Sequence, residues 1–329
     1  MLIVRAPFRV PLGGGGTDLP SYYEKFEGEL VSVAINKYMY VSLNRPIVDK
    51  LIRVRYSESE KVDSVDKVKH DLVREALKLT GVTEQVEIHS IADLPSGSGM
   101  GSSGSYLVAL LKALYTLRRE AVSTERIAEE ACGIEINKLK RAVGKQDQYL
   151  AAFGGLTALK INKNGDVKAT RLELPPDSLR EIENSLLIFY TGVRRQASDI
   201  LDHQKRAVKN KDKEVTENLH QIKAIGVDIL KALKRGDISA LGTLFDFHWQ
   251  CKKRLSGAIS NNNFDDLYQQ ARLAGALGGK LMGAGGGGFF LFCCPGDKNK
   301  LRGVMARAGL TEMFFNFDFD GVKVLADVR

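Results

Sequence analysis

Residues 93–105, DLPSGSGMGSSGS, place four glycines in a loop that runs directly into SYLVALLKALYTL, a segment with the pattern of a helix. Glycines allow backbone N–H groups to turn toward one anion, and the start of a helix adds the positive end of its dipole. No lysine follows the loop, so the GxxxxGK[ST] pattern of P-loop proteins is not satisfied. The stretch therefore predicts a phosphate-binding loop of another kind, with a merely structural loop as the alternative.

The candidate nucleotide contacts lie within this loop. They are Pro95, Ser96, Gly97, Ser98, Gly99, Gly101, Ser102 and Ser103. The two adjacent serines can cap the helix or place a hydroxyl on a phosphate-bound magnesium ion. Residues 99–104 also form a GxGxxG between a predicted strand and a helix, which keeps a dinucleotide-binding oxidoreductase as an alternative. That alternative leaves two further glycine-rich loops unexplained.

Those further loops are PFRVPLGGGGTD at 7–18 and LMGAGGGGFF at 281–290. The order and the residue patterns of the three loops resemble those of the GHMP kinases, the superfamily of galactokinase, homoserine kinase, mevalonate kinase and phosphomevalonate kinase. Within it, GGGGTD, GAGGGGF and the segment GKQDQY at 144–149 are most similar to D-glycero-D-manno-heptose 7-phosphate kinases. Fucokinase domains share much of this spelling.

Strands and helices are expected in a non-alternating order, which favours an α+β fold over a doubly wound sheet. The resemblance implies the same class. It suggests a ribosomal-protein-like α+β domain over 1–175 and a ferredoxin-like domain over 176–329, with the active site in the cleft between them. The Pro175–Pro176 pair marks the expected boundary.

The resemblance also implies the catalytic residues. In GKQDQY it places Asp147 at the position of the family's catalytic aspartate, which could accept the proton of the attacking hydroxyl. Arg9 matches the arginine of the sugar-kinase branch, which can pair with Asp147 and oppose charge on the phosphoryl oxygens. From the residues alone, Asp147 could equally cap a helix and Arg9 could lie on a strand surface.

A magnesium site follows from the resemblance as well. Glu135 precedes Asp147 by 12 residues, the spacing at which galactokinase-like members place a magnesium-binding glutamate that acts with the loop serine. The expected ligands are therefore Glu135 and Ser103. Glu129 and Glu130 are rivals for the first position, and Ser102 is the rival for the second.

The substrate-binding candidates implied by the resemblance are Gly14, Gly15, Thr17, Asp18, Arg194, Arg195, Gly285 and Gly286. Thr17 and Asp18 are expected to bind sugar hydroxyls. The two arginines follow a glycine turn in YTGVRRQAS, where they could bind a substrate phosphate or face solvent at a helix start. Lys145 is a further candidate cation. The third glycine loop either lets the backbone approach the substrate or is a structural bend.

The predicted reaction is phosphate transfer from ATP, with Mg²⁺, to the anomeric C1 hydroxyl of D-glycero-D-manno-heptose 7-phosphate, giving the 1,7-bisphosphate. A neutral-sugar 1-kinase acting on L-fucose or galactose is the nearest alternative. The first loop reads GGGGTD rather than the GEHTD of galactokinases, which argues against galactose. A further alternative is a non-catalytic module on the same fold that senses a sugar or a nucleotide.

Composition is compatible with this enzyme. The chain has 329 residues, 44% of them hydrophobic, and a net charge of +8. Because the basic residues are dispersed among acids, a nucleic-acid partner is not expected, whereas a basic balance suits anionic ligands such as ATP and a sugar phosphate. Neither a signal peptide nor a membrane segment is expected, so the predicted location is the cytoplasm. The oligomeric state is open, with a homodimer among the options.

Cysteine spacing and turn signals complete the expectations. The four cysteines show no CxxC pattern and are expected to be buried, reduced thiols without zinc. The NGD of 164–166 predicts a hairpin turn, and a second hairpin is expected within 312–327. Helices are expected over about 196–210, 214–234, 237–254 and 264–277.

Overall fold

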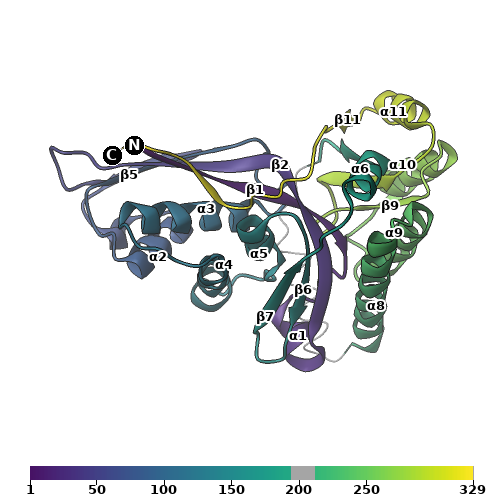
Figure 1. Cartoon of the computed structure of the whole chain (residues 1–329), viewed down its shortest axis with the longest axis horizontal. Helices are drawn as coiled ribbons and strands as arrows, with labels where there is room; N and C mark the ends of the chain where they lie inside the picture. The colour runs from purple at the N-terminus through teal and green to yellow at the C-terminus, as the bar shows by residue number, and fades with distance from the viewer. Residues whose placement is uncertain (194–211, 329) are drawn as a thin grey trace.

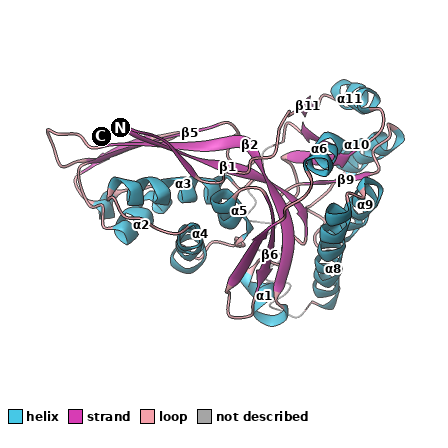
Figure 2. Ribbon diagram, viewed as in Figure 1, coloured by secondary structure: helices cyan, strands magenta, loops and turns pink. Residues whose placement is uncertain are grey.

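The computed structural model describes residues 1–193 and 212–328. Within them, the strands form one eight-stranded and one four-stranded sheet, with helices packed against both (Figures 1 and 2). The strands are β1 (Leu2–Gly13), β2 (Gly28–Asn44), β3 (Ile52–Arg55), β4 (Ser59–Val62), β5 (Val86–Ala92), β6 (Leu156–Ile161), β7 (Val167–Arg171), β8 (Leu186–Tyr190), β9 (Gly278–Leu281), β10 (Phe289–Cys293), β11 (Thr311–Glu312) and β12 (Lys323–Asp327).

Each helix or helical turn joins or covers these strands. They are α1 (Pro20–Phe26), a 3₁₀ turn η1 (Val65–Lys67), α2 (Asp71–Thr80), α3 (Ser102–Leu117), α4 (Thr124–Cys132), a π-helical turn η2 (Gly133–Lys138), α5 (Gln146–Phe153), α6 (Pro176–Ser185), α8 (Lys213–Arg235), α9 (Ile238–Lys253), α10 (Asn262–Leu273) and α11 (Lys298–Arg307). The expected helix over 196–210 lies outside the described residues.

The larger sheet is built around the long strand β2. Its strand order is β12-β1-β2-β5-β3-β4, and β6 and β7 continue from the other end of β2. Ten of the twelve residues of β1 are buried, so this strand is covered on both faces along most of its length. The helices α2 to α5 lie on one side of this sheet in Figure 1, and the core they form with it includes most of α3.

Strand β1 carries two prolines, which cannot donate to a strand ladder. The pairing with β2 shifts register after Pro7 and again after Pro11. Between the two shifts lies Arg9, whose backbone N–H donates to the carbonyl of Met100 at 3.3 Å instead. At Arg9, β1 is therefore hydrogen-bonded to the glycine-rich loop that precedes α3.

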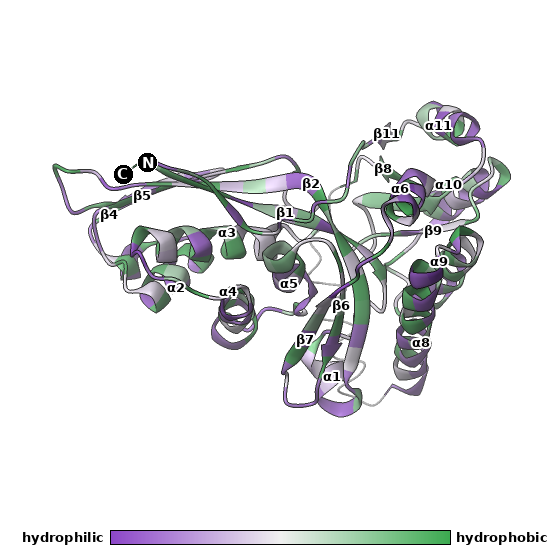
Figure 3. Cartoon of the chain, viewed as in Figure 1, coloured by the Kyte–Doolittle hydropathy of each residue, from purple (hydrophilic) through white to green (hydrophobic). Residues whose placement is uncertain are grey.

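The smaller sheet has the order β11-β8-β10-β9, and all its pairs are antiparallel. Helix α9 packs against β9, and α8 packs against α9 and against the long strands β1 and β2. Figure 3 shows α8 with both hydrophobic and hydrophilic residues, as a helix with one covered face must have. Phe290 and Phe292 of β10 lie in a second buried cluster with residues of α9 and α10.

The turn expected at 164–166 and the buried, free state expected of the cysteines are confirmed, and two helix ends have residues that are typical of caps. Ser123 is the N-cap of α4, where its Oγ accepts a hydrogen bond from the N–H of Arg126 at 3.1 Å. Gly81 ends α2 in the left-handed conformation. The NGD turn connects β6 and β7 in an antiparallel pair. All four cysteines are buried and free.

The predicted C-terminal hairpin is wrong. Strand β11 pairs with β8 of the small sheet, whereas β12 pairs with β1 of the large sheet, so the two never face each other. The segment between them crosses from one sheet to the other. Helix α10 also ends at Leu273, four residues earlier than expected, because the chain must turn into β9. A boundary at residue 175 stays a prediction, although the chain's last strand returns to the first sheet.

In the two described ranges, no helix combines the length and the apolar character that crossing a bilayer requires.

Candidate active site

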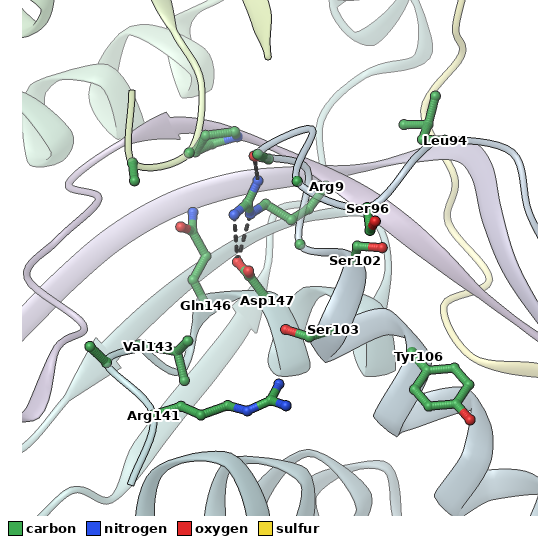
Figure 4. Close-up of a pocket in the computed structure, with 18 of the residues that line it drawn as sticks. Arg9, Leu94, Ser96, Ser102, Ser103, Tyr106, Arg141, Val143, Gln146 and Asp147 are labelled. Atoms are coloured by element: carbon green, nitrogen blue, oxygen red, sulfur yellow. Dashed lines mark hydrogen bonds and ion pairs between the residues drawn. The ribbon is translucent and has the colours of Figure 1, made fainter. Parts of the chain in front are cut away.

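A cavity of about 1410 Å³ lies between the two sheets and receives residues from both (Figure 4). The first part of the chain lines it with Arg9, Gly15, Gly16, Asp18, Pro95, Ser96, Gly97, Gly99, Gly101, Ser102, Ser103, Arg141, Gln146 and Asp147. The second part lines it with His248, Lys252, Lys280, Leu281, Gly283 and Ala284. The three glycine-rich loops thus meet at one cavity, although they are far apart in the sequence.

An ion pair at the centre of this cavity joins Arg9 to Asp147, 138 residues away. The Nε and Nη2 atoms of Arg9 both lie 2.7 Å from Oδ1 of Asp147, and Nη1 donates to the carbonyl of Gly99 at 2.7 Å. Figure 4 shows these contacts between the start of α5 and the loop before α3. Arg9 is only 5% exposed, so the guanidinium is held rigidly between the carboxylate and the loop.

Two glycines allow α3 and α5 to approach closely enough for this arrangement. A Cβ atom on Gly104 would lie 2.8 Å from the Cβ of Asp147, closer than real side chains come. Gly101 has φ +85° and its Cβ would lie 3.1 Å from the Asp147 carboxyl carbon. The glycines of GMGSSG therefore serve the packing of Asp147 as well as the loop.

Gly104→Ala is expected to destabilise the fold by about 1–3 kcal/mol, because the added methyl group overpacks the α3–α5 contact. It is also expected to lower kcat by about 10- to 100-fold, because Asp147 must move. Urea unfolding and initial rates measure the two effects. Gly303→Ala, in α11 and away from the cavity, is the matched control, since its Cβ meets only a flexible arginine at 3.4 Å. Equal rates for both variants would contradict this role of Gly104.

Glu135 lies in the π-helical turn and is 0% exposed. Burial raises the pKa of its carboxyl group, and side-chain hydrogen bonds from Ser103 and Gln148 act in the opposite direction. Gln148 Nε2 donates to Glu135 Oε2 at 2.6 Å, and Arg141 Nη1 lies 3.4 Å from Oε1. The structure thus brings together Glu135 and Ser103, the two predicted magnesium ligands. Gln148 Oε1 is a buried oxygen without a hydrogen-bond partner among the described residues.

The two rival glutamates have other partners. Glu129 binds the Nζ atom of Lys145 at 3.1 Å and the hydroxyl of Tyr149, and Glu130 accepts from Tyr115 at 2.6 Å and from Arg126. Neither glutamate lines the cavity. Lys145 itself is tied to Glu129 and to the carbonyl of Gly165, so its place is structural rather than in the cavity wall.

The first glycine loop contributes Asp18 to the cavity. Burial raises the pKa of Asp18, and the charge of the neighbouring Asp147 adds to the effect. The Asp18 carboxylate accepts hydrogen bonds from the N–H groups of Gly16 and Gln146, both at 3.1 Å. A carboxyl group with a raised pKa beside the Arg9–Asp147 pair is suited to bind the hydroxyl of a ligand.

Thr17 and Gly14 differ from the expectation that they bind sugar. The Thr17 hydroxyl is fully buried and donates to the Gly14 carbonyl at 2.8 Å, while it accepts from the N–H of Glu29. Neither residue lines the cavity. The hydroxyl is used to close the loop onto β2, so the candidate ligand contacts of this loop narrow to Gly15, Gly16 and Asp18.

The third glycine loop also differs from its expected role. Gly285 and Gly286 pack on Ile259, whose carbonyl accepts from the N–H of Gly286 at 2.9 Å. The residues that do line the cavity are Gly283 and Ala284. A Cβ on Gly283 would lie 2.7 Å from the carbonyl oxygen of Gly99. The close backbone approach that this loop permits is therefore to the phosphate-binding loop.

In the loop of residues 93–105, Ser98 is buried and absent from the cavity wall, whereas the other predicted nucleotide contacts line the cavity.

Beyond this loop, the rings of His70 and Tyr106 lie 5.3 Å apart at the cavity wall, next to Tyr56. Burial lowers the pKa of His70, so a neutral aromatic surface borders the phosphate loop. Arg194 and Arg195 lie outside the described residues.

The sequence analysis missed the basic residues that the second part of the chain gives to the cavity wall, which are His248, Lys252 and Lys280. The first two lie on α9, which no motif marks, and the third lies on β9, immediately before the third glycine-rich loop. Burial lowers the pKa of Lys252 to about 7, with Arg9 as the second cause. Inward-facing basic residues on an otherwise apolar element were the only available signal.

Comparison with known proteins agrees with this geometry. Residues 66–155 match the model of the GHMP kinases N terminal domain, and 229–309 match that of the GHMP kinases C terminal. D-glycero-alpha-D-manno-heptose 7-phosphate kinase of Campylobacter jejuni is 30% identical over 97% of each chain. The chain belongs to the GHMP kinases. Like other GHMP kinases, it is an ATP-dependent phosphotransferase, and like its heptose kinase relative it acts on a sugar hydroxyl.

Two further proteins, a galactokinase and a heptose kinase of known structure, are also similar to this chain along nearly its whole length. Galactokinase of Pyrococcus furiosus is 26% identical over 92% of this chain and 91% of its own. The structure of a D-glycero-D-manno-heptose 1-phosphate kinase from Bacteroides thetaiotaomicron superposes with a TM-score of 0.82, 24% identity and full coverage of both chains. These matches confirm the GHMP kinase fold as a mixed α+β, two-domain architecture. The dinucleotide-binding alternative is wrong, because the chain matches both GHMP kinase domains.

Proposed function

We propose that this GHMP kinase transfers the γ-phosphoryl group of ATP to the C1 hydroxyl of D-glycero-D-manno-heptose 7-phosphate, giving the 1,7-bisphosphate. The observation that carries the proposal is the Arg9–Asp147 pair beside a glycine-serine loop at the base of the cavity. The 30% identical relative supports the heptose, because its name places a phosphate at C7. The structural neighbour's name places one at C1, so the position of the existing phosphate is part of the proposal.

Asp147 is the proposed base. Both contacts from Arg9 go to Oδ1, which leaves Oδ2 for the acceptor hydroxyl. As the sugar oxygen bonds to the γ-phosphorus, its proton passes to Asp147 and the bond to the bridging oxygen of ADP breaks. Arg9 opposes the negative charge on the transferring group, and Asp18 is the proposed partner of a neighbouring sugar hydroxyl.

The N–H groups of the loop around Gly97, Gly99 and Gly101 and the start of α3 are proposed to bind the ATP phosphates. The aromatic surface of His70 and Tyr106 is the proposed site of the nucleoside. Ser103 and Glu135 are proposed to hold Mg²⁺, which supplies charge neutralisation on the phosphates when bound. The fit is chemical: a hydroxyl, a carboxylate and the unpartnered Oε1 of Gln148 are all oxygen donors, which this ion prefers.

The family resemblance makes Arg194 and Arg195 candidates for binding the substrate phosphate, and that part of the proposal rests on sequence alone.

Initial rates with ATP and a panel of acceptors test the proposed function. Heptose 7-phosphate is expected to have the highest kcat/KM, above heptose 1-phosphate, L-fucose and galactose. Phosphorus NMR of the product is expected to show a new phosphate at the anomeric carbon. A preference for L-fucose or galactose would identify a neutral-sugar 1-kinase instead, and ATP consumption with none of these sugars would contradict the proposed acceptor class.

A further inference from the structure

Three basic side chains are buried in the wall that the second sheet gives to the cavity. His248 and Lys252 lie one turn apart on α9, and Lys280 lies on β9, against which α9 packs. Their exposed fractions are 4%, 8% and 2%. The charge of Arg9 lowers the pKa of both Lys252 and Lys280. This basic cluster therefore adjoins the Arg9–Asp147 pair.

None of the three has an acidic partner among residues 1–193 and 212–328. Lys252 Nζ donates to the carbonyls of Leu281 and Gly283, both at 2.7 Å, and Lys280 Nζ donates to the carbonyl of Leu12. Neither ring nitrogen of His248 has a hydrogen-bond partner in another described residue. Carbonyl dipoles compensate a buried ammonium group only in part, so the cluster lacks negative charge.

The mutual effects of the basic groups agree with this deficit. Burial lowers the pKa of Lys280 strongly, and the charges of Lys252 and Arg9 lower it further. Burial also lowers the pKa of His248, followed by the charges of Lys280 and Lys252. Lys252 therefore disfavours the charged forms of Lys280 and His248, while Arg9 disfavours those of both lysines, and an anion placed among these groups would favour their charged forms.

We propose that Lys252, Lys280 and His248 form a buried anion subsite that binds a phosphate group of the reactants next to Arg9. A phosphate suits the site because donors converge from two elements, and a dianion offers several acceptor oxygens to them. The identity of that phosphate rests on the proposed function. It is either the phosphate that the acceptor sugar already carries or the one in transfer.

Calorimetric titration with inorganic phosphate, with ADP present at saturation to fill the nucleotide loop, tests the subsite without any acceptor. Lys252→Met is expected to raise the Kd for phosphate by about 10- to 100-fold relative to the unaltered enzyme. Lys253→Met is the matched control, since the adjacent lysine pairs with Asp265 at 3.0 Å outside this cavity. The two variants binding phosphate equally well would overturn the proposal.

Proton uptake gives a second readout that needs no variant. Lys252 has a pKa of about 7 in the free protein, so at pH 8 it is mostly neutral, with Arg9, Lys280 and His248 as the facing basic groups. A bound dianion favours its charged form, so phosphate binding at pH 8 is expected to take up protons. The binding enthalpy would then vary with the ionisation enthalpy of the buffer. Phosphate binding at pH 8 without net proton uptake contradicts the subsite.

The lowered pKa of Lys252 also predicts how the stability of the folded enzyme depends on pH. The pKa of Lys252 is lower in the folded chain than its ordinary value of 10.5, so the unfolded chain binds more protons between these values. The unliganded enzyme is therefore expected to gain stability as the pH rises from about 7 to 9. Lys252→Met is expected to reduce that gain, whereas Lys253→Met is expected to retain it. The same gain in all three proteins would overturn the inference.

Kinetics with two acceptors identifies the source of the phosphate. If the acceptor's own phosphate occupies the subsite, Lys252→Met raises KM for heptose 7-phosphate about 10- to 100-fold, and the loss of kcat/KM is much larger for heptose 7-phosphate than for free heptose. If the transferring phosphate occupies it, kcat falls with both acceptors. No change with either acceptor would overturn the subsite. The enzyme could bind phosphate in a way that depends on Lys252 and still be inactive on heptose 7-phosphate. That result would support the anion subsite and refute the proposed acceptor.

Discussion

Replacing Asp147 with asparagine is expected to lower kcat by roughly 100- to 10,000-fold while ATP and the sugar phosphate still bind. The amide has nearly the shape of the carboxylate but cannot accept the proton of the acceptor hydroxyl. It also leaves the Arg9 guanidinium, which is buried, without its anionic partner. Steady-state rates and direct binding of each ligand separate the loss of turnover from a loss of affinity.

Asp177→Asn is the matched control for this variant. Asp177 also lies in the first turn of a helix and pairs with an arginine, Arg180, at 2.6 Å, but it is exposed and far from the cavity wall. Its replacement is expected to leave kcat unchanged. Turnover of Asp147→Asn within a factor of a few of the control would mean that Asp147 serves only the start of α5.

The sequence was informative where function depends on backbone shape. Some positions must lack a Cβ atom so that a loop can bind phosphate, α3 can pack closely on α5, or two loops can touch. Only glycine meets this requirement, so such positions can be read from the sequence. Gly99, Gly101 and Gly104 could therefore be recognised without a structure. The pairing of Arg9 with Asp147 followed from the family resemblance, because no local rule joins residues 138 positions apart.

The roles of individual side chains within a recognised loop could not be predicted as well. Thr17 follows four glycines, but its hydroxyl is used by the loop itself. Gly285 and Gly286 lie in a run of four glycines whose members face different neighbours, and only the backbone path decides which of them meets the cavity. A glycine run fixes a place where the chain bends, not the direction of each N–H group.

The buried basic residues show a second limit. A lysine on a helix such as α9 is normally expected to be exposed, and Lys253 next to it keeps 27% of its side chain exposed. Lys252 is buried instead because its side chain points toward β9 and the third glycine loop. This depends on how two elements pack, which neither periodicity nor charge pattern specifies. The crossing of the final segment to β12 escaped prediction for the same reason.

Glu135→Gln is expected to raise the magnesium concentration needed for half-maximal rate by about 10- to 100-fold, and to lower the rate at low magnesium correspondingly. Glutamine keeps the size of the side chain and its oxygen still accepts from Gln148, but the negative charge is lost. Magnesium requires the ionised carboxylate, whereas burial in the free protein favours the neutral form, so the charge serves the ion rather than the fold. Unfolding without metal is therefore expected to change little.

Titration of magnesium at saturating ATP measures this effect, with Glu130→Gln as the control. Glu130 lies in the preceding helix α4 and binds Tyr115 and Arg126 away from the cavity, so its replacement should leave the magnesium dependence unchanged. Ser103→Ala is expected to shift the titration in the same direction as Glu135→Gln, because the two side chains adjoin. If Glu130→Gln moved the titration and Glu135→Gln did not, the magnesium site would have to lie a turn or more away from the Ser103–Glu135 contact.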